Sequence, residues 1–525
     1  MAEETVIITR KEYDKFCAQK AELDKLNQWV QTLSEQLILA NKHRFGMSSE
    51  KTKVYNDDSQ PSLFFNEAEQ TADEAIKSLP TKEVKVKEHL RKQRVIDPDH
   101  LPENIEVEEI VNDIPEEERK CDECGGELEE IGTDVKYAIA LIPAKWIIRK
   151  TITHAYRCPD CKKRTGLAHI IRAREAPSVI PGGEATAEAI SYIAVEKYVK
   201  AVPLYRLEQQ LNAGGLPLSR QTMSNWLIKA SELYFKPMVQ RMREMLIQEE
   251  ILHADETRLQ VLHEPERKAE TDSFIWLYRT GRDVSQQLVI YDYQETRASQ
   301  HPKDFLSGFK GYLHTDGYAG YHKLSPDIRV VGCMAHARRK FIEALEVVKK
   351  ENRSASTAAR AVEYFDKLFR LEEEFSGLVP DERKDRRKEL SEPIITEMKS
   401  WISRLNAGPK TTLGKAVHYF LEQYPWLCAY LEDGRLEISN NLAERSIKPF
   451  VIGRKNFLFC NTPSGADSSA AIYSIIETAK ENGLDPYRYL TWVLQTAPAL
   501  NMKAPEQVDS LLPMNAPTEC RSHAG

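Results

Sequence analysis

Apolar residues near the amino terminus recur with the spacing of a coiled coil. They follow a 3-4-3-4-3 pattern, which lines them along one seam of a helix: Leu23, Leu26, Val30, Leu33, Leu37 and Ala40, with Phe16 one heptad earlier. The pattern predicts a coiled-coil helix over residues 11–43, through which copies of the chain associate. An amphipathic helix that packs on its own chain is the alternative, because the pattern is short.

Residues 44–95 lose this periodicity. They contain the turn-forming stretch NDDSQPS and the basic stretch KEVKVKEHLRKQR, so we expect a linker that is partly basic. The positive charges could contact phosphate, although runs of charge are more often simply solvated.

Residues 96–178 combine short, strand-like apolar runs with two Cys-x-x-Cys pairs. Cys121 and Cys124 form the first pair, Cys158 and Cys161 the second, and 33 residues separate the pairs. Four thiolates presented from two tight turns suit one tetrahedral zinc ion, whose binding would stabilise a segment with few large apolar residues. We therefore predict a zinc-binding module with one structural zinc. A redox dithiol or two unrelated pairs is the alternative.

Residues 180–240 have a helical pattern that breaks at Gly214 and Gly215. Ser219 suits the N-terminal cap of the next helix. The pattern predicts a helix-turn-helix, whose second helix would present polar side chains to DNA base edges: Arg220, Gln221, Ser224 and Asn225. Such hairpins also occur as plain scaffolding.

Strand-like runs then follow at residues 250–262, 273–279, 287–293, 311–314 and 328–334, with a helix-like stretch at 296–309. A helical, strand-poor stretch comes next, and further helices are predicted at 440–448 and 468–482. This order predicts a mixed α/β region followed by a helical stretch.

Two aspartates stand where strand-like runs end. We expect Asp255, in HADET, at the tip of the first strand and Asp316, in HTDGYAGY, at the tip of the fourth. Carboxylates that converge at strand tips need a cation, and their hard oxygens suit Mg²⁺. Taken singly, the motifs read more simply as a helix cap and a turn. We expect Glu256, beside Asp255, to point elsewhere.

A third acid, Glu444, lies in a predicted helix that starts near Asn440 and ends at Pro449. Helical spacing gives it a broad polar face, and the stretch GRKN adds positive charge beyond the proline: Asn441, Arg445, Lys448, Arg454 and Lys455. Standing alone, this stretch would read as a solvated helix.

Charge and cysteine content refine this picture. A net charge of −7 over 525 residues argues against a nucleic-acid partner, yet fifteen acids crowd into residues 97–130 and nine Lys or Arg into residues 143–174. Such segregation guides binding better than the total does. The start MAEETVIITRKEYD is no signal peptide, no run of eighteen apolar residues occurs, and most of the nine cysteines are isolated. We expect a cytoplasmic protein without membrane contact.

The motifs HADET, HTDGYAGY and NNLAERSIKPFVIGRKNFLF, in this order, resemble those of the bacterial insertion-sequence-66-type transposases. The likeness extends over most of the chain, from RFGMSSEK to SIIETAKENGLDPYRYL. It implies a ribonuclease-H-like core in two parts, residues 245–345 and 436–497, with a helical insertion at 346–435 between them and a tail at 498–525. In that core Asp255, Asp316 and Glu444 would be catalytic acids that hold two Mg²⁺ ions. Cys333-Met-Ala-His336 matches a Cys-x-x-His element of that family, and its role stays open.

The resemblance implies a DNA transposase that acts at the nucleoid. The helix-turn-helix and the zinc module would bind the terminal inverted repeats, and the acids would cleave the strands and join them to target DNA. Phosphates near the scissile bond would be neutralised by Arg445, Lys448, Arg454 and Lys455. The expected partners are double-stranded DNA, a second copy of the chain and accessory proteins encoded in the same element.

Two other function classes stay open at this point. A catalytically silent, sequence-specific DNA-binding regulator would use the same N-terminal modules and bind DNA whether or not Mg²⁺ is present. A metal-dependent nuclease would cleave DNA without joining it.

Overall fold

The computed structural model describes residues 19–20, 145–152, 154–158, 169–172, 177–349 and 352–522. The chain divides into two compact units, Met1–Gly46 with Thr151–Gly525, and Met47–Lys150. Almost all of the predicted coiled coil, the whole linker and the acidic block lie outside the described residues, as do three of the four paired cysteines. Strands β1 (Ala155–Cys158) and β2 (His169–Arg172) form an antiparallel pair, and Cys158 ends the first of them.

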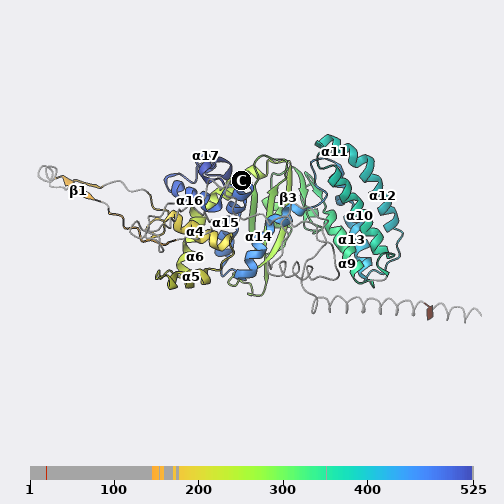
Figure 1. The fold of residues 1–525 in the computed structure, drawn as a ribbon, viewed down its shortest axis with the longest axis horizontal. Coiled ribbons are helices and arrows are strands. Elements are labelled where there is room, and N and C mark those ends of the chain that lie inside the picture. Colours follow the sequence, from red (N-terminus) through yellow and green to blue (C-terminus); the bar gives the residue numbers. More distant parts are fainter. Residues whose placement is uncertain are drawn as a thin grey trace, which may run out of the picture. The chain divides into compact units, whose positions relative to one another are not determined.

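A five-stranded mixed sheet lies at the centre of residues 177–522 (Figure 1). Its order is β5-β4-β3-β6-β7, with the bounds β3 Ile251–Gln260, β4 Asp272–Thr280, β5 Val289–Gln294, β6 Gly311–His314 and β7 Ile328–Val331. The first three strands form an antiparallel meander, whereas β6 and β7 run parallel to β3. The predicted mixed α/β class is confirmed, and each strand overlaps its predicted run.

The middle strands are apolar on both faces, as strands covered on two sides must be. In β4, Ile275, Trp276, Leu277 and Tyr278 have no exposed surface. Helix α14 (Asn441–Phe457) packs on the face that carries Tyr291 of β5, whose hydroxyl donates to the Ser446 carbonyl. Helix α8 (Gln300–Phe305) connects β5 to β6.

The edge strand β5 is capped by side chains of helix α15 (Pro463–Glu481). The amide of Tyr291 donates to the Ser474 hydroxyl at 2.8 Å, and the amide of Val289 donates to the Thr478 hydroxyl at 3.0 Å. Four helical residues rise about 6 Å and two strand residues about 7 Å, so hydroxyls spaced four apart match amides spaced two apart. The capping shields an edge that would otherwise offer unpaired backbone groups.

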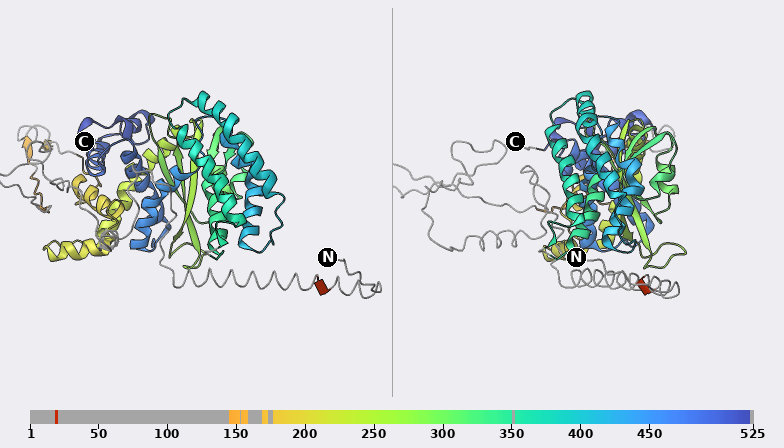
Figure 2. Two further views of the ribbon diagram at one scale, coloured as in Figure 1. Left: turned by 45° about the vertical axis from the view of Figure 1, so that its right-hand side comes forward. Right: turned by 90° about the vertical axis from the view of Figure 1, so that its right-hand side faces the viewer.

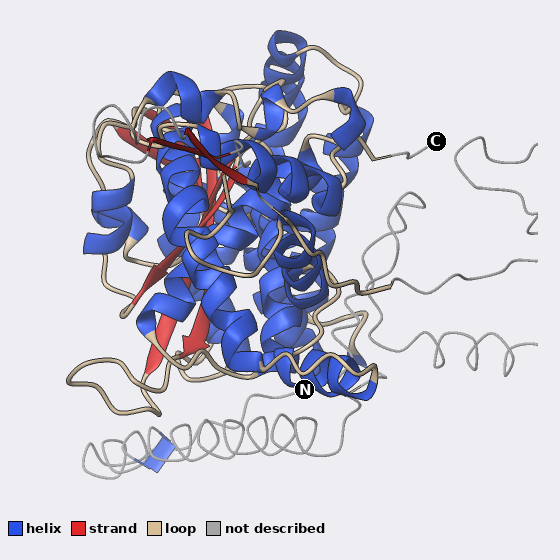
Figure 3. Ribbon diagram, turned by 90° about the vertical axis from the view of Figure 1, so that its left-hand side faces the viewer, coloured by secondary structure: helices blue, strands red, loops and turns tan. Residues whose placement is uncertain are grey.

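Helices α4 to α7, which precede the sheet in the chain, and the last helices of the chain lie together on one side of the sheet, on the left in Figure 1 and in front in Figure 3. Their bounds are α4 Ala187–Tyr198, α5 Leu204–Ala213, α6 Arg220–Ala230, α7 Lys236–Leu246, α16 Pro486–Thr496 and α17 Pro505–Asp509. Ser219 caps α6 as predicted, its hydroxyl accepting from the amide of Thr222 at 3.1 Å.

The strand-poor stretch is helical and forms a layer on the other side of the sheet (Figure 2). Helices α10 and α13 pack on α9, which follows β7. The bounds of this layer are α9 Met334–Glu346, α10 Thr357–Glu374, α11 Pro380–Arg386, α12 Glu392–Ile402 and α13 Thr412–Leu427. Phe341, Phe365 and Phe420 meet in tilted and edge-on ring contacts inside this layer. No described helix is both long and apolar enough to cross a membrane.

Helix α14 does not end at Pro449, and the prediction was wrong there. Proline removes a single backbone donor and disfavours the turn before it, but Ile447 and Phe450 are buried on either side of it. Their packing stabilises the helix through the proline to Phe457.

Candidate active site

Asp255 lies inside β3, at the point where one edge of that strand loses its partner. Pairing with β6 ends at His253 and His314, whereas pairing with β4 continues to Gln260. The expectation that Asp255 ends the strand was therefore wrong, because the antiparallel neighbour extends it. Asp316 follows the last residue of β6 by two positions, so both aspartates lie where the two parallel strands separate.

Asp255, Asp316 and Glu444 come together at this fork. Burial raises the pKa of Asp255 well above its ordinary value, and the charges of Glu256, Asp316 and Glu444 raise it further. Two of these carboxylates are oriented by backbone: Asp255 accepts from the amide of Glu256 and Asp316 from the amide of Tyr318, both at 2.9 Å. A cluster of this kind is destabilised by its own charge until a proton or a cation binds.

Glu444 stands in the first turn of α14 and faces helix α9. Its carboxylate oxygens lie 3.5 Å from Nδ1 of His336 and 3.4 Å from a guanidinium nitrogen of Arg339. Among the described residues, neither Oε1 of Glu444 nor Nδ1 of His336 has a hydrogen-bond partner, although both atoms are buried. These atoms and the Cys333 thiol lie within 4.8 Å of one another. Burial raises the pKa of that thiol to about 12, so it is protonated and acts as a neutral acceptor.

A buried cluster joins the segments that carry the three acids. The rings of His253 and His314, paired residues of β3 and β6, stack with centroids 4.4 Å apart. Asn440, the residue before α14, donates through Nδ2 to the Ala254 carbonyl at 2.8 Å, and its Oδ1 lies 3.0 Å from Nδ1 of His253. Because the amide nitrogen is already used, Oδ1 is the acceptor and His253 carries its proton on Nδ1.

The same cluster reaches the end of β7. The backbone amide of Asn440 donates to the Cys333 sulfur at 3.1 Å, and Nε2 of His314 accepts from the amide of Glu437 at 3.2 Å. Burial lowers the pKa of His253 to about 3 and that of His314 well below its ordinary value, so both rings are neutral. Sequence reasoning missed this cluster. The signal for it was the repeated His-x-Asp of HADET and HTD.

Glu256 turns away from Asp255, as expected. It forms an ion pair with Arg297 and accepts from the Tyr321 hydroxyl at 2.7 Å. Arg297 also lies 3.9 Å from Asp316 and 4.0 Å from the centre of the Tyr318 ring. This guanidinium therefore links the neighbouring carboxylates.

A hollow of about 310 Å³ lies next to Glu256, the residue after Asp255. It is lined by Glu256, Thr257, Arg258, Phe274, Arg297 and Arg454. Arg454 donates to the Thr257 hydroxyl at 3.2 Å and to the Arg258 carbonyl. Two of the three guanidinium groups already pair with carboxylates, Arg297 with Glu256 and Arg258 with Asp272. The lining still carries more positive than negative charge, which favours an anion such as phosphate.

The other predicted DNA contacts fall in two places. Arg445 is half-buried. Burial lowers its pKa, and the charge of Arg282 lowers it further, whereas Glu437 raises it. Lys448 is half-buried and Lys455 is exposed, on the same side of α14 as Glu444. In α6, Arg220, Gln221 and Asn225 are exposed and Ser224 is half-buried, which leaves the predicted recognition face accessible.

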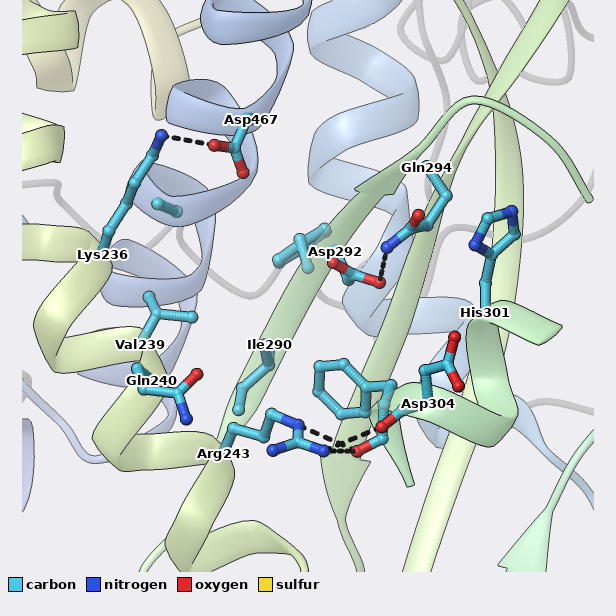
Figure 4. A pocket seen from close by; sticks show the side chains of 13 residues that line it. Lys236, Val239, Gln240, Arg243, Ile290, Asp292, Gln294, His301, Asp304 and Asp467 are labelled. Atoms are coloured by element: carbon cyan, nitrogen blue, oxygen red, sulfur yellow. Dashed lines mark hydrogen bonds and ion pairs between the residues drawn. The ribbon is translucent and has the colours of Figure 1, made fainter. Parts of the chain in front are cut away.

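A larger hollow, of about 390 Å³, lies between α7, β5, α8 and α15 (Figure 4). Lys236 pairs there with Asp467, and Arg243 donates to the carbonyls of Asp304 and Phe305. None of the three converging acids lines it, so the candidate active site is the fork between β3 and β6.

A model described as "Transposase IS66 family" matches residues 182–468, more than half of the chain. The chain belongs to this family. Further matches are the "IS66 C-terminal element" at residues 474–514, the "zinc-finger binding domain of transposase IS66" at 118–162 and the "Transposase C of IS166 homeodomain" at 32–110. The resemblance in the sequence is thereby confirmed.

Three similar proteins come from Sinorhizobium fredii and are described as uncharacterized. The protein y4jD is 29% identical over 79% of this chain and 81% of its own length. The protein y4hP is 28% identical over 86% of this chain and 82% of its own, and y4qI is 28% identical over 94% and 91%. The likeness therefore covers at least about four fifths of the length of each of these proteins.

Membership in the transposase IS66 family brings zinc-binding and DNA-binding regions with it. The zinc-finger match spans all four paired cysteines, which supports a zinc ion in that segment. The main family match spans α4 to the first part of α15 and includes the fork with its three acids.

Proposed function

We propose that this transposase cleaves and joins DNA strands, with Asp255, Asp316 and Glu444 as its catalytic acids. The observation that carries the proposal is the convergence of these carboxylates at the fork, reflected in the raised pKa of Asp255. A ribonuclease-H-like core is the fold that we propose for residues 245–345 and 436–497. Three antiparallel strands followed by two parallel ones, with an acid on the first strand and another after the fourth, support it.

The residues at the fork fit divalent cations. Carboxylate oxygens are the donors that Mg²⁺ prefers, and one buried oxygen of Glu444 has no hydrogen-bond partner among the described residues. We propose that the three acids hold two Mg²⁺ ions. Bound there, the ions would activate a water or a DNA 3′-hydroxyl and stabilise the leaving oxygen in an in-line displacement.

The chain's own side chains prepare the site for this chemistry. The Asn440 cluster positions Glu444 against the strand that carries Asp255, and backbone amides orient both aspartates. We propose that the arginine-lined hollow, together with Lys448 and Lys455, binds the phosphates next to the scissile bond. Preorganised cations of this kind lower the barrier because they need not rearrange during the reaction.

Recognition and pairing of the DNA ends fall to the N-terminal regions in this proposal. Helix α6 reads base edges in the terminal inverted repeats, and the zinc module, held by Cys121, Cys124, Cys158 and Cys161, assists it. The coiled coil brings two protomers and two ends into one complex. Accessory proteins encoded in the same element complete the assembly.

The decisive test uses labelled DNA that carries the repeats flanking the gene, with Mg²⁺ and a target plasmid. Wild type and Asp327→Asn, which alters an exposed aspartate near β7, should nick and join the DNA. Asp316→Ala should bind the ends without forming products. An Asp255→Ala or Glu444→Ala protein that still cleaves would contradict the assignment.

Other outcomes distinguish the alternatives. Cleavage without joining identifies a nuclease. Binding without any Mg²⁺-dependent product identifies a DNA-binding regulator, unless adding the neighbouring gene products restores joining.

A further inference from the structure

Helix α14, which begins at the candidate active site, ends in an exposed apolar tip. Leu458 is 63% exposed and Phe459 is 43% exposed. Large apolar side chains are rarely left in water side by side unless they meet a partner. This tip, Leu458 with Phe459, is therefore a candidate contact surface.

The backbone of the tip is strained. Leu458 has φ 68° and ψ −52°, and the amide of Phe459 donates to the Phe457 carbonyl at 2.9 Å. These values define a γ-turn with positive φ, a rare and strained conformation that glycine adopts far more easily than leucine. Because Leu458 is mostly exposed, burial of its side chain does not offset the strain of the turn. A leucine at this position therefore indicates a role other than stabilising the fold.

The tip is also held in place. The amide of Cys460, directly after it, donates to the Gln260 carbonyl at 2.9 Å, and the amide of Leu262 donates to the Cys460 carbonyl at 3.0 Å. These bonds tie the tip to the end of β3. The tip is therefore attached both to β3, which carries Asp255, and to α14, which carries Glu444.

Positive charge lies along α14 between the active site and the tip. Lys455 and Arg454 stand three and four positions before Leu458, and Lys448 lies two turns before Lys455 on the face of Glu444. Leu458 lies fourteen positions after Glu444 along α14, which corresponds to a rise of about 21 Å. Along duplex DNA this length spans roughly six base pairs at 3.4 Å per step.

We propose that α14 lies along the duplex and that Leu458 and Phe459 insert against DNA bases about six base pairs from the cleaved bond, the distance that the helix rise and the base-pair step give for this orientation. Apolar wedges of this kind unstack a base step while cations beside them bind the phosphates. The cations next to the tip favour DNA over an apolar protein partner. The inference rests on the proposed transposase function.

The test uses the full-length protein and end duplexes that carry 2-aminopurine at successive positions. Without Mg²⁺, wild type should raise the fluorescence most at about the sixth base pair, as the spacing above requires. Leu458→Gly and Phe459→Ser should abolish that rise and reduce joined products about tenfold, the scale of one lost base contact. Leu458→Gly should melt no lower than wild type, because glycine relieves the turn. If Leu458 only stabilised the fold, its replacement by glycine would lower the melting temperature.

Val379→Ser is the matched control, since Val379 is 59% exposed in the helical insertion. It should keep both the fluorescence rise and the joining. If Leu458→Gly kept both as well, the proposal would be overturned. It would also be overturned if that variant altered only the oligomeric state, because the tip would then be a protein contact.

The two proposals fail in different ways. If the wild type unstacks the bases but does not cleave the DNA, the insertion of the tip is supported and the catalytic function is contradicted. If it cleaves and joins the DNA without unstacking, only the insertion of the tip is contradicted. A wild type that does not bind the DNA ends would contradict both.

Discussion

Asp292 shows at the scale of one residue how burial costs stability at neutral pH. It lies in β5, where burial, only partly offset by a hydrogen bond from Gln294, raises its pKa to about 6. The folded state therefore binds a proton more tightly than the unfolded state, and stability falls as pH rises from about 4 through 6.

We expect Asp292→Asn to be more stable than wild type at pH 8 by about 2 kcal/mol, because the asparagine carries no charge to bury. At pH 4 the two proteins should unfold at nearly the same urea concentration. Urea unfolding at both pH values measures this difference. A pH-independent difference would show that packing, and not ionisation, sets the cost.

Asn440 determines where Glu444 stands. It has no exposed surface, and its side chain joins Ala254 to His253 across the start of α14. Asn440→Leu would leave a carbonyl and an imidazole nitrogen unpaired, which should cost about 2–4 kcal/mol of unfolding free energy.

The matched control is Asn441→Ala, since Asn441 is the exposed neighbour in the same Asn-Asn pair. Its unfolding free energy should change by less than about 0.5 kcal/mol. Denaturant unfolding of both variants tests the role of the cluster. Equal effects at the two positions would contradict it.

At the scale of elements, one buried arginine ties the helical insertion to the segment that leads into α14. Arg387 donates to both carboxylate oxygens of Glu372 and to the carbonyls of Tyr430, Asp433 and Leu436. The guanidinium fork can satisfy all these acceptors at once, which an ammonium group cannot do.

Arg387→Lys should therefore lower the unfolding free energy by about 3 kcal/mol. Arg386→Lys is the control, because this adjacent side chain is half exposed and pairs with Glu389 at the surface. Thermal melting of the two variants should show a clear decrease for the first and almost none for the second. Equal melting temperatures would mean that the insertion is held by apolar packing alone.

Elements were largely predictable from the sequence because their signals are local. The apolar run of β4 and the Ser219 cap of α6 each lie within a few residues. The two errors, at Pro449 and at the end of β3, arose where packing by distant segments overrode a local signal. Ile447 and Phe450 pack around the proline, and β4 extends the strand past Asp255.

At the scale of the whole molecule, the sheet region has a buried core of its own. A chelator that removes zinc should therefore expose residues 96–178 to protease and leave the melting of the sheet region unchanged, because zinc binding supplies folding energy only to its own module. Limited proteolysis with mass spectrometry locates the cuts.

Cys121→Ser should reproduce the effect of the chelator, whereas Cys428→Ser, which alters an isolated cysteine in the helical insertion, should not. A chelated protein that resists protease throughout residues 96–178 would contradict the zinc assignment. Loss of the sheet region's own transition would show instead that zinc stabilises the whole chain.

The sequence by itself determined the class of the molecule. Periodicity, caps and short motifs act over a few residues, so they identified the strands, the helices, the paired cysteines and the family. Only the tertiary structure decided how Asp255 and Glu444, 189 positions apart in the chain, come to share one site. It does so through Asn440 and the stacked His253 and His314, whose contacts join distant segments and leave no periodic pattern along the chain. The direction in which Glu256 turns and the exposure of Leu458 were decided in the same way, because they depend on which strands and helices meet in the folded chain.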